Sequence, residues 1–363
     1  MRATERLYEL WNLPPSGVER VQMKYDVAVI GAGPAGSFAA LKLSSLGYRI
    51  LIIDPCDTKK VCAGILTAQY IRKYGIHEDF VERVLKGIRI SFRDIHAEIT
   101  YRKTVEYSIN RESYDRFNLN EAIIAGSELK KETVLSVEEK ESSIMIRTNK
   151  DTIIADYAII ASGVSELGQL CKGPKKYAFC VQQKKDLKPD DYYEIDLQPG
   201  SYSWVAPKKD HVLTGSSSLE NYPDIPGEKG LIPLEPFKKT FSRRFLLAGD
   251  AAGFVSPFEG EGIYYSRRSG EIAAETLSEA MAGKNTLRDY QIRWKKEFDF
   301  SGLSMISYLV SNSRNLEAFV RLTRDNEKFN NFVEDILTRE SKKFKISEIG
   351  FLLKMLSKDL LLK

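Results

Sequence analysis

The chain has 363 residues, 43% hydrophobic and 10% aromatic, a composition typical of globular proteins with substantial cores rather than of disordered chains. Its 54 basic and 50 acidic side chains leave a formal net charge of +4, which argues against a general attraction to nucleic acid. Four cysteines without a paired spacing and only three histidines argue against a disulfide scaffold, and we predict no metal site.

The first elements expected along the chain form a β-α-β unit. Residues 1–23 form a charged extension, and no apolar run reaches the roughly 20 residues needed to cross a membrane, so we expect a cytoplasmic protein. Tyr25–Ile30 is an apolar run followed by glycine, Ser37–Leu46 has helical apolar spacing, and Tyr48–Ile53 is a second apolar run. This order predicts the start of a Rossmann-type nucleotide-binding domain.

A glycine motif lies between the first strand and the helix of this unit. Gly31, Gly33 and Gly36 form GxGxxG, which allows a tight turn, a close approach of the backbone to a pyrophosphate, and close helix packing. The helix N-terminus then faces the phosphates. Asp54 ends the second strand, where a carboxylate accepts hydrogen bonds from a ribose. Together these residues predict a dinucleotide site.

The middle of the chain alternates between strand and helix patterns. Residues 89–107 alternate as strands do, Asn118–Ala125 has helical spacing, and Tyr157–Ala161 is again a buried type of strand. Residues 177–219 are rich in aromatic and β-forming residues broken by turn formers, which predicts a separate antiparallel sheet.

A third buried strand and a long helix follow. Phe245–Ala248 leads into Gly249 and Asp250, and Ile263–Ala282 has a long helical pattern. Glycines at 260 and 262 just before that helix let backbone N–H groups approach a ligand on which negative charge develops. The chain after about residue 285 is helical in pattern.

Four segments resemble one family. They are GDAAGFVSPFEGEGI (249–263), INRESYDRF (109–117), KKVCAG (59–64) and YSWVAPK (202–208). With the glycine motif, they resemble the geranylgeranyl reductase family of flavoproteins, within the wider group that shares the para-hydroxybenzoate hydroxylase fold. The resemblance covers roughly Lys24 to Ala282 and implies FAD as the cofactor.

The resemblance also implies roles for individual residues. Asp250 would contact the ribityl-pyrophosphate part of FAD, Arg111 would lie near the cofactor with Arg116 as a second candidate, and Cys62 and Ala63 would lie beside the flavin ring. The expected cofactor contacts are Gly31, Gly33, Ala35, Gly36, Asp54, Cys62, Ala63, Arg111, Val134, Asp250, Gly260, Gly262 and Ile263.

The YSWVAPK segment resembles the family's YxWxFPK motif, whose aromatic residues line the channel for the isoprenoid chain. It implies Tyr202, Trp204 and Pro207 as substrate contacts, and strand alternation places the first two on one face. Ala206 stands where the family has phenylalanine, and Ala63 and Ile65 replace glycines of its KxCGGG motif. We therefore expect a reshaped channel and a loop that approaches the ring less freely.

These features predict an α/β fold, α+β overall. A discontinuous FAD-binding domain takes residues 24–88, 105–170 and 240–284. An antiparallel-sheet substrate domain takes 89–104 and 171–239, and a helical C-terminal region takes 285–363.

The leading functional prediction is saturation of carbon–carbon double bonds in an isoprenoid lipid by hydride from reduced FAD. Cys62, Tyr202 or a water could supply the proton, and NAD(P)H or a small redox protein could supply the electrons. A polyprenyl glycerolipid, a polyprenyl diphosphate and a quinone side chain all stay open as substrates. The alternatives are an aromatic-ring or lipid monooxygenase and a flavin-binding protein without turnover.

The C-terminal segment 342–363 mixes leucines with lysines and is consistent with a basic amphipathic helix. Such a helix could dock on a membrane surface, which would make the protein peripheral to the membrane, or pack its apolar side on its own chain.

Overall fold

The first sheet explains the long apolar runs near the start of the chain. The computed structural model describes residues 25–56, 60–102, 105–165, 167, 176–338 and 343–361, with side chains described to 357. The strand order is β8-β2-β1-β11-β10-β9, with β17 also beside β11. The strands are β1 (Tyr25–Ile30), β2 (Ile50–Ile53), β8 (Glu128–Lys130), β9 (Val134–Glu139), β10 (Ile144–Thr148), β11 (Thr152–Ile160) and β17 (Phe245–Leu247).

Parallel pairing in this sheet places several strand ends at one edge. Strands β1, β2, β8, β11 and β17 pair in parallel, while β9 and β10 form an antiparallel extension. Val27, Ala28 and Val29 are fully buried, as expected for a central strand covered on both faces. Ligands of open parallel sheets bind beyond the carboxyl ends of such strands.

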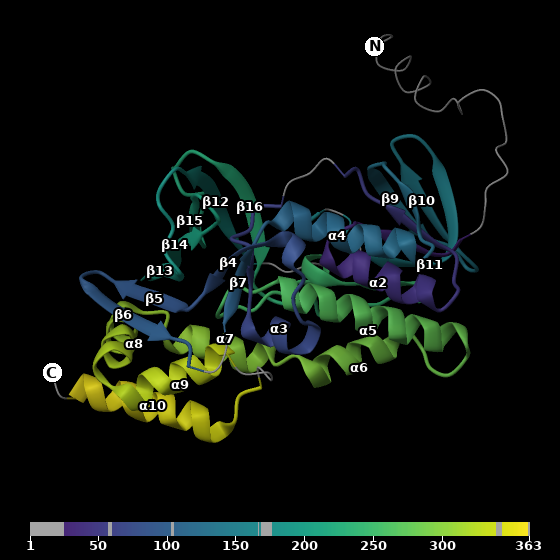
Figure 1. Cartoon of the computed structure of the whole chain (residues 1–363). Helices are drawn as coiled ribbons and strands as arrows, with labels where there is room; N and C mark the ends of the chain where they lie inside the picture. Colours follow the sequence, from purple (N-terminus) through teal and green to yellow (C-terminus); the bar gives the residue numbers. More distant parts are fainter. Residues whose placement is uncertain are drawn as a thin grey trace, which may run out of the picture.

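A layer of helices covers this sheet (Figure 1). It contains α2 (Pro34–Ser45), α4 (Arg111–Ile124) and α5 (Ile263–Met281), with α6 (Arg288–Glu297) beside α5. Helix α4 begins at Arg111, seven residues before the helical pattern that we identified from the sequence, because the side chain of Asn110 caps its first turn by accepting from the amide of Ser113 at 2.9 Å.

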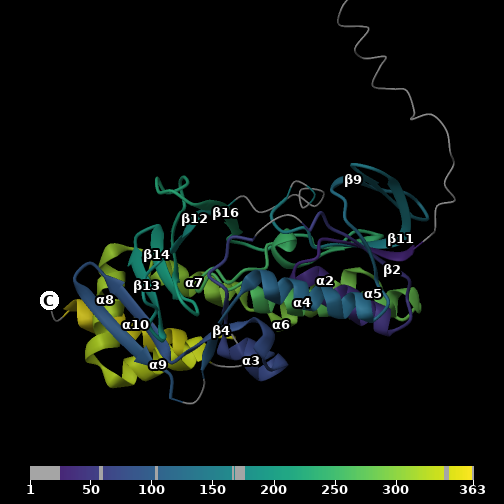
Figure 2. The ribbon, with the colours of Figure 1, turned by 45° about the horizontal axis from the view of Figure 1, so that its top comes forward.

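A second, mainly antiparallel sheet lies beside the first region (Figure 2). Its order is β16-β12-β15-β14-β13-β5-β6, and only the β13–β5 pair is parallel. The strands are β5 (Gly87–Phe92), β6 (Ile95–Thr100), β12 (Tyr177–Lys185), β13 (Tyr192–Gln198), β14 (Ser201–Pro207), β15 (Val212–Ser218) and β16 (Glu228–Pro233). A short sheet of β3 (Ile65–Leu66), β7 (Glu106–Ile109) and β4 (Val81–Leu85), with α3 (Ala68–Tyr74), links the regions.

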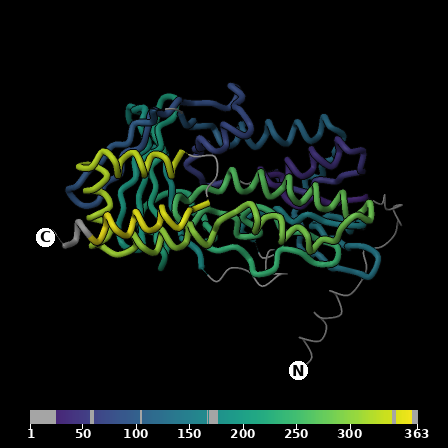
Figure 3. Tube along the Cα trace, turned by 90° about the horizontal axis from the view of Figure 1, so that it is seen from below, coloured from purple at the N-terminus to yellow at the C-terminus, as the bar shows by residue number. Residues whose placement is uncertain are grey.

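The C-terminal helices cover the β5–β6 end of the second sheet (Figure 3). They are α7 (Phe300–Leu309), α8 (Ser313–Asp325), α9 (Glu327–Thr338) and α10 (Ile346–Leu361). Phe319 and Phe329 pack with Leu352 and Leu356 in one buried cluster together with Ile90. The expected fold class, with a Rossmann-like sheet, a separate antiparallel sheet and helices at the end of the chain, is confirmed; the domain limits stay a prediction.

Helix α10 packs its apolar side on the chain. Leu352 and Leu356 are 1% and 3% exposed, whereas Leu353 faces solvent. Within the described residues no helix is both long and apolar enough to cross a membrane. Contact of this segment with a membrane surface stays a prediction.

Candidate functional site

One large cavity joins the two sheets. It has a volume of about 2430 Å³ and extends from the carboxyl ends of β1 and β2, beneath the second sheet, to α7, α8 and α9. Small-molecule sites usually occupy roughly 300–1,000 Å³, so this cavity has room for more than one ligand. Its far part is lined by apolar side chains that include Ile90, Ile195, Leu197 and Phe319.

Two of the three glycines in the turn are required by close packing. Gly31 has φ +106°, and a Cβ there would lie 2.3 Å from the carbonyl oxygen of Ala161. A Cβ at Gly36 would lie 1.9 Å from the carbonyl oxygen of Gly31, so this residue packs the helix on the turn and does not line the cavity. Gly33, in contrast, has no atom within 4 Å of such a Cβ.

The open space at Gly33 faces the start of α2. Gly33 is the N-cap of that helix, and no side chain caps it. The first N–H groups of a helix and its dipole favour an anion. Ala35, in the first turn, lines the same cavity. This end of the cavity therefore fits the pyrophosphate of a dinucleotide.

Asp54 and Val134 extend this part of the cavity away from the glycine turn. The carboxylate of Asp54 accepts from the amide of Ala32 at 2.7 Å and from the amide of Cys56 at 2.7 Å. These hydrogen bonds fix Asp54 at the end of β2, and the one from Ala32 stabilises the glycine turn. Val134, at the start of β9, also lines the cavity.

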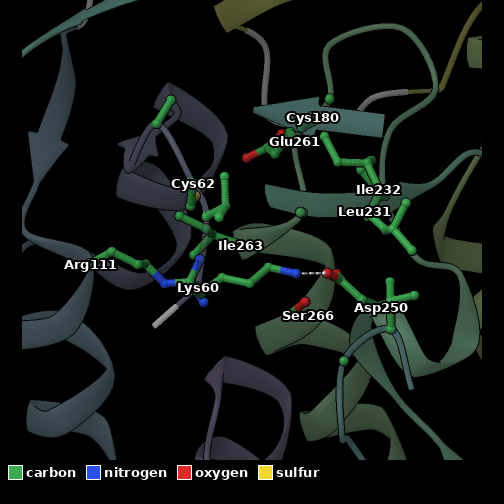
Figure 4. Close-up of a pocket in the computed structure, with 18 of the residues that line it drawn as sticks. Lys60, Cys62, Arg111, Cys180, Leu231, Ile232, Asp250, Glu261, Ile263 and Ser266 are labelled. Atoms are coloured by element: carbon green, nitrogen blue, oxygen red, sulfur yellow. Dashed lines mark hydrogen bonds and ion pairs between the residues drawn. The ribbon is translucent and has the colours of Figure 1, made fainter. Parts of the chain in front are cut away.

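Asp250 lines the same cavity from a short 3₁₀ helix, Gly249–Ala252. Its carboxylate accepts from Lys60 Nζ at 2.6 Å, and Figure 4 shows the lysine extended across the cavity to reach it. Gly262 is the N-cap of α5, again without a capping side chain, and Ile263 is the first residue of that helix. A second positive helix end therefore faces the cavity.

The loop Cys62–Gly64, called the Cys62 loop below, lies between Arg111 and the second sheet. Arg111 Nε donates to Asp115 at 3.1 Å, and Figure 4 shows the guanidinium directed toward the Cys62 loop. Burial lowers the pKa of Arg111, but Asp115 and the Cys62 thiol raise it by more, so this side chain stays charged. The amide of Gly64 donates to Cys62 Sγ at 3.3 Å. Arg116, the second candidate on α4, also lines the cavity.

Gly64, at the end of the KKVCAG segment, occupies a position that requires glycine. It has φ +68°, and a Cβ there would lie 2.6 Å from the carbonyl oxygen of Ile109 and 2.9 Å from Lys208 Nζ. The flanking Ala63 and Ile65 have side chains that the structure accommodates, and Ile65 pairs with Ser108 in a short strand. Of positions 63–65, only position 64 requires glycine.

Tyr202 and Trp204 lie on the face of β14 that lines the cavity, with ring centroids 5.7 Å apart. The indole of Trp204 lies over Gly215, where a Cβ would come within 2.0 Å of its Cζ2. Burial raises the pKa of Tyr202 above its usual value, so the phenol keeps its proton. Pro207 is buried at the end of β14 and does not line the cavity.

Gly260 lies close to the second sheet, where the segment before α5 approaches Tyr202. It has φ +67°, and a Cβ on it would lie 3.2 Å from the hydroxyl of Tyr202. The segment before α5 therefore meets the aromatic face of the second sheet, and the Cys62 loop lines the same cavity. No group of three or more metal-ligating side chains occurs among the described residues.

Comparison with known proteins identifies the fold and its chemistry. The family model for pyridine nucleotide-disulphide oxidoreductases matches residues 25–201. The chloroplastic geranylgeranyl diphosphate reductase of Arabidopsis thaliana is 29% identical over 366 residues, covering 83% of this chain and 78% of that protein. A digeranylgeranylglycerophospholipid reductase of Methanococcus vannielii is 28% identical over 329 residues, covering 76% and 84% respectively. The chain is an FAD-dependent oxidoreductase related to geranylgeranyl reductases.

Solved structures show how widely this fold is used. A geranylgeranyl bacteriochlorophyll reductase-like protein from Thermoplasma acidophilum aligns with a TM-score of 0.69 and 21% identity, covering 93% of the oxidoreductase and 96% of that chain. A flavin-dependent brominase aligns with a TM-score of 0.69 and 15% identity, covering 94% and 100%. At these identities the two structures show the fold alone.

The structure also places residues at the oxidoreductase's site that the sequence patterns did not single out. They are Lys60, paired with Asp250; Gly64, in the Cys62 loop; Gly215, beneath Trp204; and Lys208, which donates to the Cys62 loop. Lys60 and Lys208 belong to the quoted KKVCAG and YSWVAPK segments, which was a usable signal. Gly215 gave none, because only the pairing of β14 with β15 brings it opposite Trp204.

Proposed function

We propose that this oxidoreductase saturates carbon–carbon double bonds in the isoprenoid chain of a lipid. The observation that carries the proposal is the continuity of the cavity from the helix ends at Gly33 and Gly262 to the apolar space under the second sheet. A cavity whose far part is lined by Ile90, Ile195, Leu197 and Phe319 suits an isoprenoid chain better than a compact polar substrate. The two relatives described above are named for geranylgeranyl substrates, which supports the same class.

The proposed mechanism divides the work between cofactor and chain. When bound, reduced FAD supplies a hydride to one carbon of the double bond. The N-terminus of α2 would hold the pyrophosphate, and that of α5 would stabilise negative charge on the ring. Tyr202 and Trp204 position the alkene, and the apolar lining excludes water. NAD(P)H or a small redox protein would supply the electrons.

Cys62 is the proposed proton donor to the neighbouring carbon. Thiols ordinarily have a pKa of about 8.5 and phenols about 10, and burial makes the phenol of Tyr202 a weaker acid still. The thiol S–H bond breaks as the new C–H bond forms, and water reprotonates the thiolate after turnover. Arg111 beside the sulfur stabilises the anion left behind.

An anaerobic stopped-flow experiment tests this function. The FAD-loaded protein is reduced with dithionite and mixed with a geranylgeranyl glycerolipid or with geranylgeranyl diphosphate. We expect flavin reoxidation without oxygen and a lipid product that gains two hydrogen atoms per double bond. Reoxidation only after oxygen is admitted would contradict the proposal and favour a monooxygenase, while a flavin that no substrate reoxidises would indicate a binding protein.

The role of Cys62 has its own test. Replacing Cys62 with Ser should lower the single-turnover reoxidation rate by roughly 10²-fold, the usual share of a general acid. FAD affinity should change little, because serine is nearly isosteric. Reoxidation at the wild-type rate would remove Cys62 from the mechanism and leave water as the donor.

A further inference from the structure

A buried lysine joins three of the segments that form the site. Lys208 directly follows β14 and is only 2% exposed. Its Nζ donates to the carbonyl oxygen of Ala63 at 2.8 Å, to the carbonyl oxygen of Ile109 at 2.8 Å and to Ser108 Oγ at 2.9 Å. An ammonium group has three N–H donors, so these contacts use its full capacity.

The acceptors of Lys208 come from the elements that carry the predicted chemistry. Ala63 follows Cys62 in the loop, and Ile109 stands two residues before Arg111 at the start of α4. The amide of Ile109 also donates to the carbonyl oxygen of Gly64 at 2.8 Å. Lys208 itself continues the strand that carries Tyr202 and Trp204. One ammonium group thus connects the loop, the helix start and the aromatic strand.

The electrostatic setting is unusual for a purely structural contact. The nearest carboxylate, Glu82, lies 3.6 Å away, while the closer partners are neutral oxygens. Desolvation lowers the pKa of Lys208, partly offset by Glu82 and by the Cys62 thiol. Burying a cation among neutral acceptors costs stability. A neutral side chain could fill the same space at a lower cost in folding stability. The buried charge therefore suggests that Lys208 has a function besides packing.

We propose that Lys208 is a positioning residue that fixes the Cys62–Gly64 loop at the junction of the cofactor and substrate parts of the cavity. By holding the Ala63 carbonyl, it sets the direction in which the Cys62 thiol faces. Because Ala63 and Ile65 occupy positions where the KxCGGG motif has glycine, the loop backbone is less free at those positions, and Gly64 supplies its left-handed residue. Lys208 keeps the thiol in line with the alkene held by Tyr202 and Trp204.

This inference rests on the proposed function only for turnover, so its test also measures the loop directly. In the FAD-loaded protein, Lys208→Met should increase the rate of Cys62 alkylation by iodoacetamide about tenfold, because the loop loses the hydrogen bonds that hold it in place. Peptide mass spectrometry identifies the alkylated site. Lys209→Met, at the exposed neighbour, should alkylate at the wild-type rate.

The kinetic signature separates positioning from general stability. Lys208→Met should lower kcat for lipid reduction by roughly 10²-fold, as expected for a misplacement of about 1 Å, while KM for the lipid changes little. As the pH rises through the lowered pKa of Lys208, the amine loses a donor, so wild-type turnover should fall on the alkaline side. Lys208→Arg keeps its charge, so it should lose the part of the alkaline decline that comes from position 208, while any decline from other groups remains.

Unchanged Cys62 alkylation and unchanged kcat in Lys208→Met would overturn the inference. If that variant does not fold, Ser108→Ala removes a single acceptor and should still accelerate Cys62 alkylation severalfold, about 1 kcal/mol for one neutral partner. Wild-type alkylation in Ser108→Ala would then overturn it. If the wild-type protein reduces no lipid, the proposed function fails, and the alkylation rates still decide the role of Lys208.

Discussion

The two halves of the cavity are built in opposite ways. The glycine turn of the cofactor half depends on contacts between residues close in the sequence: Gly36 packs on Gly31, and Asp54 accepts a hydrogen bond from Ala32. The substrate half depends on residues far apart, such as Trp204 over Gly215 and Lys208 against the Cys62 loop. A short motif can therefore reveal the first half, whereas only the paired strands reveal the second.

A substitution that disturbs packing in the cofactor half should have the largest effect on stability and on FAD binding. Gly36→Ala forces a Cβ against the carbonyl oxygen of Gly31 and should lower the free energy of unfolding by roughly 1–3 kcal/mol, with loss of bound FAD. Thermal denaturation and the flavin absorbance of the purified protein measure both.

The matched variant Gly33→Ala separates packing from binding. Its Cβ meets no atom, and its φ of −70° suits alanine, so stability should stay within about 0.5 kcal/mol of wild type. FAD affinity should nevertheless fall about tenfold, a free-energy change of about 1.4 kcal/mol, because the methyl group enters the space for the pyrophosphate. Wild-type FAD affinity in this variant would contradict the placement of the pyrophosphate.

Disturbing the substrate half should leave the cofactor in place. Gly215→Ala pushes the Trp204 indole out of its position at a cost of roughly 1–3 kcal/mol. We expect KM for the lipid to rise about tenfold or more while FAD affinity is unchanged. Gly350→Ala, where a Cβ meets no atom within 4 Å, serves as the control. A loss of FAD affinity in Gly215→Ala would show that the two halves are not separable.

The smallest expected effect concerns cysteine reactivity. Burial raises the pKa of Cys180 to about 12, partly offset by Lys60, so its thiol stays protonated until the pH approaches that value. Because the thiolate is the reactive form, iodoacetamide at neutral pH should modify the exposed Cys56 well before Cys180. Rapid modification of Cys180 in the folded protein would show that the second sheet opens on its own.

Much of the cofactor half could be predicted because its signals are local. The strand, glycine turn, helix and Asp54 follow one another within about 30 residues, the length of a βαβ unit. The start of α4 was placed too late, although Asn110 before Arg111 is a helix-capping signal. The glycine motif assigned Gly36 to ligand contact and the family resemblance assigned Pro207, but neither lines the cavity: Gly36 packs on Gly31, and Pro207 is buried at the end of β14.

The contacts of the substrate half could not be predicted from the sequence, because the register between paired strands decides which residues face each other. Alternation correctly predicts that Tyr202 and Trp204 share a face, but not that Gly215 lies opposite Trp204. Likewise, the YSWVAPK segment indicates that Lys208 belongs to the site, but not that it is buried against Ala63 and Ile109. Such contacts join residues on separate elements, and local spacing carries no information about them.

The meeting of both halves at the Cys62 loop is most directly tested by a crystal structure of the FAD-loaded protein with a geranylgeranyl lipid. The account predicts the pyrophosphate at Gly33, the flavin ring between the Cys62 loop and the start of α5, and the isoprenoid chain beneath Trp204 toward Phe319. A lipid chain bound outside this cavity, or a flavin ring far from Cys62, would contradict it.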